Sequence, residues 1–127
     1  MDVFRLPVGI DFVGDSKLPE QSDAESRRYV FAYTITLSHH AGVPARLANR
    51  HWIITDGNGT QREVRGPGVV GEHPHLSLGE RFRYSSGAVL DTQIGSMQGS
   101  YEFVADDGES FLVPIPAFTL AMPNVLH

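Results

Sequence analysis

Residues 29–37 constrain the fold most, because large side chains alternate there with smaller ones. The odd positions hold tyrosine, phenylalanine, isoleucine and leucine, and the even positions are mostly small or hydroxylated. A period of two places all the large side chains on one face of a β-strand, whereas a helix would scatter them around its circumference. The segment therefore predicts a half-buried strand.

The same alternation recurs in further segments of the chain, and residues typical of turns separate these segments. Further strands are expected at 8–12, 50–55, 60–65, 81–85, 100–104 and 110–113, with hairpin turns at 56–59 and 106–109. About seven short strands without a convincing amphipathic helix predict an all-β fold. We expect an antiparallel β-sandwich of the immunoglobulin or fibronectin type III kind, and a small barrel is the alternative closure.

The bulk composition describes a single globular domain spanning residues 1–127. Hydrophobic residues make up 41% of the chain and charged residues 20%, and the absence of cysteine excludes disulfides, thiolate catalysis and cysteine-ligated zinc. The net charge of −5 argues against nucleic acid as a partner. No signal peptide pattern and no apolar run of ~20 residues is present, so we expect a cytoplasmic protein without membrane partners.

Three parts of the chain carry specific structural expectations. Trp52, the only tryptophan, is predicted to be a core anchor between the sheets rather than a binding residue. The polar stretch 17–28 is expected to be a surface loop. Prolines 114, 116 and 123 predict that the C-terminal segment is either an edge strand or an extended arm, and its apolar residues must pack on this domain or on a partner.

Gly66, Gly68 and Gly71 match the spacing of a dinucleotide-binding loop, which requires a following helix. Pro74 and Gly79 leave no room for that helix, so the Rossmann interpretation is excluded. Two interpretations remain for the loop. Its amides could form a weak phosphate or pyrophosphate site together with Arg65, or the glycines could simply provide positive φ at a bend.

The sequence offers no catalytic residue, no cofactor motif and no complete metal site. His73 and His75 are weak metal candidates, because residues two positions apart could point the same way, but no acidic residue stands at a spacing that completes a site. Their alternative interpretation is as solvated loop residues. The adjacent pair at 39 and 40 would point to opposite faces, and the acidic residues at 106–109 are explained by turn formation. We therefore do not expect an enzyme.

Six segments together resemble the ApaG family: LPEQS at 18–22, YVFAYTI at 29–35, RHWIITD at 50–56, EVRGPGVVG at 63–71, MQGSY at 97–101 and VPIPAFTL at 113–120. The resemblance covers nearly the whole chain and implies a small bacterial cytosolic protein with a fibronectin-type sandwich. Similar domains in eukaryotic F-box and polymerase-interacting proteins look like interaction modules. The family implies no catalytic residue, and labels that mention cobalt and magnesium efflux imply at most an indirect role in metal homeostasis.

These observations predict a non-enzymatic protein-interaction module whose partner is another protein. Weak phosphate binding by the loop of Arg65, Gly66, Gly68 and Gly71 is the first alternative. An indirect role in cobalt or magnesium homeostasis is the second. The oligomeric state does not follow from the sequence.

Overall fold

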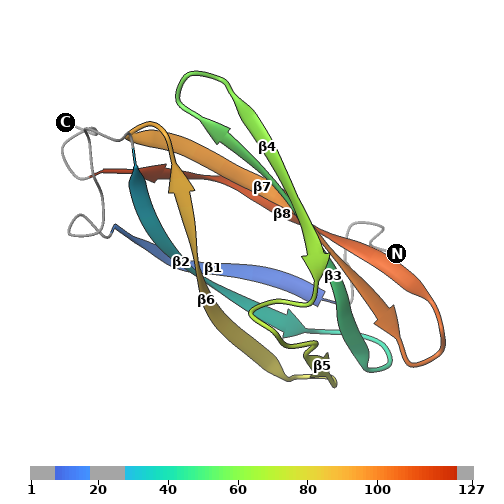
Figure 1. The fold of residues 1–127 in the computed structure, drawn as a ribbon. Coiled ribbons are helices and arrows are strands. Elements are labelled where there is room, and N and C mark those ends of the chain that lie inside the picture. Colours follow the sequence, from blue (N-terminus) through green and yellow to red (C-terminus); the bar gives the residue numbers. More distant parts are fainter. Residues whose placement is uncertain (1–7, 18–27, 123–127) are drawn as a thin grey trace.

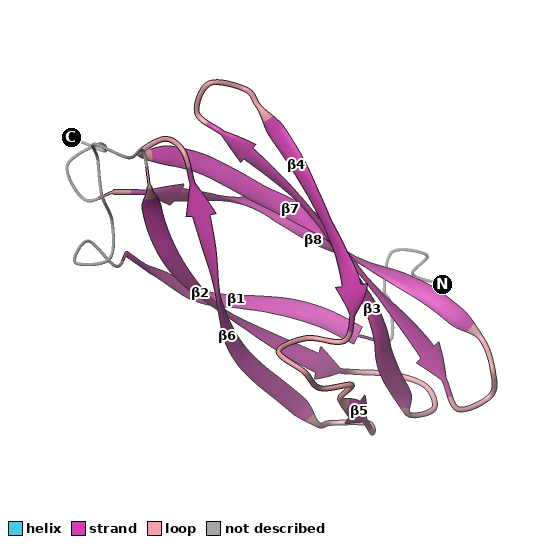
Figure 2. Cartoon of the chain, viewed as in Figure 1, coloured by secondary structure: helices cyan, strands magenta, loops and turns pink. Residues whose placement is uncertain are grey.

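The computed structural model describes residues 8–17 and 28–122, of which residues 9–17 are described by their backbone alone. Figure 1 shows the described chain as two layers of strands, and Figure 2 shows that these strands are joined by loops and turns. No helix occurs within the described ranges, so none there could cross a membrane. The strands are β1 (Val8–Lys17), β2 (Tyr29–His39), β3 (Ala45–Asp56), β4 (Gln61–Pro67), β5 (His75–Leu76), β6 (Arg81–Leu90), β7 (Ile94–Ala105) and β8 (Ser110–Ala121).

The strands form two antiparallel sheets. One sheet has the order β1-β2-β6, and the other has the order β4-β3-β7-β8 with the short β5 also paired to β3. The all-β sandwich predicted from the sequence is therefore confirmed, and the layers do not close into the barrel considered as its alternative. On one side of the sandwich the edge strands β4 and β6 face each other, and Arg62 of β4 donates a hydrogen bond to the carbonyl oxygen of Val89 of β6.

The core lies between the sheets and is built from the alternating residues that the sequence pattern predicted. In β2 the side chains of Phe31, Ile35 and Leu37 have no exposed surface. Trp52 is only 3% exposed, which confirms its prediction as a core anchor. Its indole packs edge-on against the rings of Tyr33 of β2 and Tyr101 of β7, at centroid distances of 5.6 and 6.2 Å. Such pairs add to the stabilisation that burial provides.

Several strands are longer than their sequence signals. β3 begins at Ala45 rather than at residue 50, β6 continues to Leu90, and β7 begins at Ile94. Glycines interrupt the alternation in β6 and β7, yet pairing with the neighbouring strand supplies main-chain hydrogen bonds that local propensity does not encode. The two-residue strand β5 was missed because it is too short to show a period.

Up to Ala121 the C-terminal segment is an edge strand and not an extended arm, and Pro123 lies outside the described residues. β8 pairs with β7 along residues 110–121, and prolines 114 and 116 are tolerated there because β8 has a neighbour on one side only within its sheet. Its apolar residues pack on this domain, since Leu120 and Met122 are buried and Phe118 lies 6.0 Å from Trp52 by ring centroids. The polar segment expected as a surface loop falls almost entirely on residues 18–27, which lie outside the described residues.

Candidate functional site

The glycine loop that follows β4 forms a tight hairpin. The amide of Val69 donates to the carbonyl of Glu72 at 2.8 Å, and the amide of Glu72 donates back to Val69 at 2.8 Å. The amide of Gly68 donates to the carbonyl of Ala48 at 2.9 Å. Three amides of the loop are thus used by main-chain carbonyls. The two residues at the tip, Val70 and Gly71, both have positive φ, at 44° and 81°.

The three glycines have two kinds of role: Gly68 and Gly71 have positive φ, and Gly66 makes room for a neighbouring side chain. Gly71 supplies the positive φ of the turn. Gly68 also has a positive φ of 60°, and a Cβ on it would collide with the carbonyl oxygen of Glu72. A Cβ on Gly66 would lie 2.9 Å from Nη2 of Arg50, because that guanidinium lies directly against the glycine. The spacing of the glycines is therefore explained by backbone geometry and by the close approach of an arginine.

Arg65 and Gly66 line a shallow groove of about 570 Å³ on the outer face of the β4-β3-β7-β8 sheet. We call it the outer groove; it is lined by Asn49, Arg50, His51, Arg65, Gly66, Pro67, Ser100, Glu102 and Leu112. Gly71 instead lines a second opening between the sheets. The structure therefore does not gather all four anion-loop candidates around one pocket.

The outer groove combines polar pairs with one exposed apolar side chain. Asn49 donates to the Glu102 carboxylate at 2.6 Å, and His51 lies 3.2 Å from the Glu63 carboxylate. Arg65 is 69% exposed and reaches Glu63 only at 3.9 Å. Leu112 is 61% exposed. The groove thus has an uncovered apolar residue and an uncovered cation on one face of the sheet.

The second opening, which we call the inter-sheet cleft, lies between β4 and β6 and has a volume of about 260 Å³. Its polar groups come from four strands: Tyr33 of β2, Arg50 of β3, and Tyr84 and Ser86 of β6 line it directly, and Tyr101 of β7 is hydrogen-bonded to Tyr84. Burial raises the pKa of Tyr33, Tyr84 and Tyr101, and the Arg50 guanidinium opposes that effect at each. The three hydroxyls are therefore neutral at physiological pH.

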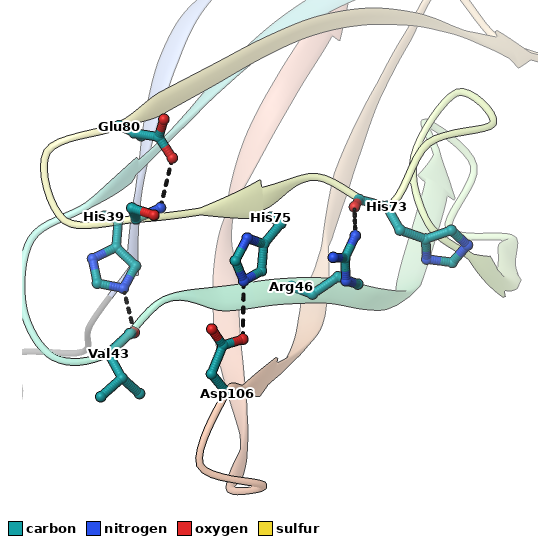
Figure 3. Close-up of polar contacts among 8 residues, drawn as sticks. His39, Val43, Arg46, His73, His75, Glu80 and Asp106 are labelled. Carbon is teal, nitrogen blue, oxygen red and sulfur yellow. Dashed lines mark hydrogen bonds and ion pairs between the residues drawn. The ribbon is translucent and has the colours of Figure 1, made fainter.

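The two histidine candidates are held by different partners. His73 bonds through Nδ1 to the carbonyl oxygen of Leu47 at 3.0 Å, and His75 bonds through Nε2 to Asp106 at 2.9 Å. Figure 3 shows the two rings directed to different places, with Arg46 between them donating to the His73 carbonyl. Among the residues that the structure describes, no group of three or more histidine, aspartate or glutamate side chains could hold a metal ion.

Sequence reasoning missed the inter-sheet cleft, although part of its signal was available. Arg50 stands at an even position of β3, in step with the buried Trp52 and Ile54, so the alternation already directed its side chain toward the core. A charged residue at such a position needs partners. Those partners are the carbonyl oxygens of Pro67 and Gly68, at 2.8 and 3.0 Å, which lie 17 and 18 residues further along the chain.

Fold and surface together define a small antiparallel β-sandwich with two surface openings, and Arg50 lines both of them. Comparison with known proteins identifies the family. The model of the ApaG domain matches residues 19–105, and the chain belongs to the ApaG family. It is 59% identical to the ApaG protein of Aromatoleum aromaticum and 57% identical to that of Nitrosomonas europaea, each over 110 residues and 87% of both chains. An ApaA protein from Bordetella pertussis has a similar solved structure, with a TM-score of 0.87, 47% identity and coverage of 93% of this chain and 95% of that one.

Proposed function

We propose that this protein is a non-enzymatic, cytoplasmic protein-interaction module, and that the outer groove and the adjacent edge of β4 form its binding surface. The observation that carries the proposal is the exposure of Leu112 within a groove whose other members are mostly polar. Binding surfaces of proteins commonly surround an apolar centre with polar groups that satisfy hydrogen bonds. Asn49, Glu102 and His51 provide such a rim around Leu112.

An extended segment of another protein is the occupant that fits this surface best. β4 is an edge strand, so alternate main-chain groups between Gln61 and Pro67 point away from β3. An added strand could pair there, as in other sheets that bind peptides. An acidic residue of that strand would pair with Arg65 of β4. Because β8 lies at the opposite edge of the sheet, a second, apolar part of the partner would cross the outer groove and cover Leu112.

Site-specific photo-crosslinking in bacterial cells tests the proposal. A photoreactive phenylalanine analogue replaces Leu112 in one variant and Leu78 in a control, because both leucines are exposed, at 61% and 64%. We expect a discrete protein adduct from position 112 and none from position 78. Arg65→Glu, added to the position-112 variant, should abolish the adduct, because it reverses the charge next to the groove. Equal labelling at both positions, or an adduct that survives the charge reversal, would refute the proposed surface.

Weak phosphate or pyrophosphate binding by the glycine loop is the second candidate function. The exposed Arg65 and the tip of the hairpin, where Val70 and Gly71 donate no main-chain bond within the described chain, favour it. Arg65→Gln is the variant of choice, since it leaves the backbone unchanged. Gly68→Ala would collide with Glu72 and unfold the hairpin whether or not an anion binds. Pyrophosphate shifts in amide NMR spectra that persist unchanged in Arg65→Gln would remove this candidate.

A further inference from the structure

The inter-sheet cleft has apolar walls and a cluster of hydrogen-bonding groups at its base. Trp52, Ile54 and Met97 are buried and form one wall, and Val64 and Val70 stand at the outer side. Arg50 is the only residue with a charged side chain among those that line the cleft in the described chain. An apolar cavity with a few convergent polar groups is the usual form of a small-ligand site.

The guanidinium of Arg50 is fixed in place before any ligand arrives. Its Nη1 donates to the carbonyl oxygens of Pro67 and Gly68, and its face lies against Gly66, where a Cβ would come within 3.0 Å of Cζ. No carboxylate among the described residues forms a salt bridge with it. The positive charge of this half-buried guanidinium therefore has no counter-ion, and its Nε and Nη2 groups are available to donate hydrogen bonds to a bound ligand.

The hydroxyl groups of the cleft add further donors. Tyr84 and Tyr101 share one hydrogen bond, and the side chains of Tyr33 and Ser86 also line the cleft. The Tyr84–Tyr101 pair has two hydroxyl protons and uses one of them in the shared bond, so the other O–H has no acceptor among the described groups. The cleft therefore offers hydrogen-bond donors next to a positive charge. Such a site is complementary to an anionic oxygen ligand.

We infer that the inter-sheet cleft binds a small organic carboxylate through Arg50 and the hydroxyls of Tyr33 and Tyr84, with the apolar body of the ligand against Trp52. The single guanidinium matches the charge of one carboxylate, whereas a phosphate dianion would keep a charge without a partner. The volume of about 260 Å³ lies just below the ~300–1,000 Å³ usual for ligand pockets, which favours a compact ligand over a nucleotide.

Titration with benzoate tests the inference on the full chain at constant ionic strength and neutral pH. Trp52 fluorescence and amide NMR shifts of residues at the cleft are the readouts, and benzamide is the control because it has the same shape without the charge. We expect saturable binding of benzoate, at least about tenfold weaker binding of benzamide, and no saturation by inorganic phosphate. Similar affinities for benzoate and benzamide, tighter binding of phosphate, or an absence of saturable shifts would overturn the inference.

Two cleft variants and one surface variant complete the experiment. Arg50→Gln should weaken benzoate binding by about tenfold or more, as expected for the loss of a charged hydrogen bond. Tyr84→Phe should weaken it by about two- to tenfold, and it tests the same site if Arg50→Gln fails to fold. Arg65→Gln should bind benzoate as the unmodified protein does, because Arg65 lines the outer groove and not the cleft. Undiminished binding by Tyr84→Phe and by a folded Arg50→Gln variant would refute the assignment.

Discussion

At Gly99 the addition of a single methyl group should greatly lower the free energy of unfolding. It lies in β7 opposite Trp52 of β3, in the middle of the longer sheet. A Cβ built on it would overlap the carbonyl oxygen of His51 and lie 2.9 Å from the carbonyl carbon and 3.1 Å from Cα of Trp52. All three neighbours are backbone atoms, so no side-chain rotation can relieve the collision in Gly99→Ala.

The loss of stability in Gly99→Ala can be worked out from the hydrogen bonds between β3 and β7 that must lengthen. Relieving the overlap requires β3 and β7 to separate by roughly 1 Å, which takes the adjacent N–H···O bonds beyond their usual ~3.2 Å. Two lost bonds whose groups stay buried cost about 1–3 kcal/mol each. We expect Gly99→Ala to lower the free energy of unfolding by about 2–6 kcal/mol, a large part of the ~5–15 kcal/mol typical of a domain.

Gly87→Ala is the matched control, because Gly87 is also a strand glycine without positive φ. A Cβ there would meet only the carbonyl oxygen of Phe31, at 3.3 Å. The small strain is offset by the reduced entropy of the unfolded chain, so we expect a change within about 1 kcal/mol. Urea unfolding followed by the fluorescence of Trp52, the only tryptophan, measures both variants. Equal stabilities of the two variants would refute the collision argument.

Three further predictions concern the cleft, the hairpin tip and the histidines. Because burial raises the pKa of Tyr84 and Tyr101, the unfolded chain loses these protons first above pH ~10, and stability should fall by about 1 kcal/mol per tyrosine between pH 10 and 11. Urea unfolding across this range should show a smaller fall for Tyr101→Phe, and an identical fall would contradict the argument. Val70→Asn should raise the melting temperature and increase the free energy of unfolding by up to about 1 kcal/mol, because asparagine tolerates positive φ better than a β-branched residue. Val70→Thr, which keeps the β-branch, should not raise the melting temperature. Replacing His73 and His75 by glutamine should leave Co²⁺ affinity unchanged by calorimetry, since each ring has its own partner; a tenfold loss would instead establish a metal site.

The anion hypothesis for the glycine loop illustrates the limit of motif reasoning. The sequence correctly excluded a crossover helix, because Pro74 and Gly79 are local signals. It could not show that Gly66 lies against the guanidinium of Arg50, since that contact joins residues 16 positions apart. Nor could it show that Arg65 and Gly71 open onto different surfaces. Whether the loop binds an anion stays a prediction that Arg65→Gln tests.

The sequence by itself determined the fold class, the positions of most strands and the core. Alternation within β2 and the inward place of Trp52 depend on neighbours along the chain, because a strand sends successive side chains to opposite faces. Only the tertiary structure decided the strand extensions past glycine and proline, the edge position of β8, and the meeting of Arg50 with the tyrosines of β2, β6 and β7. These features depend on pairing and packing between distant segments, whose energies no local pattern records.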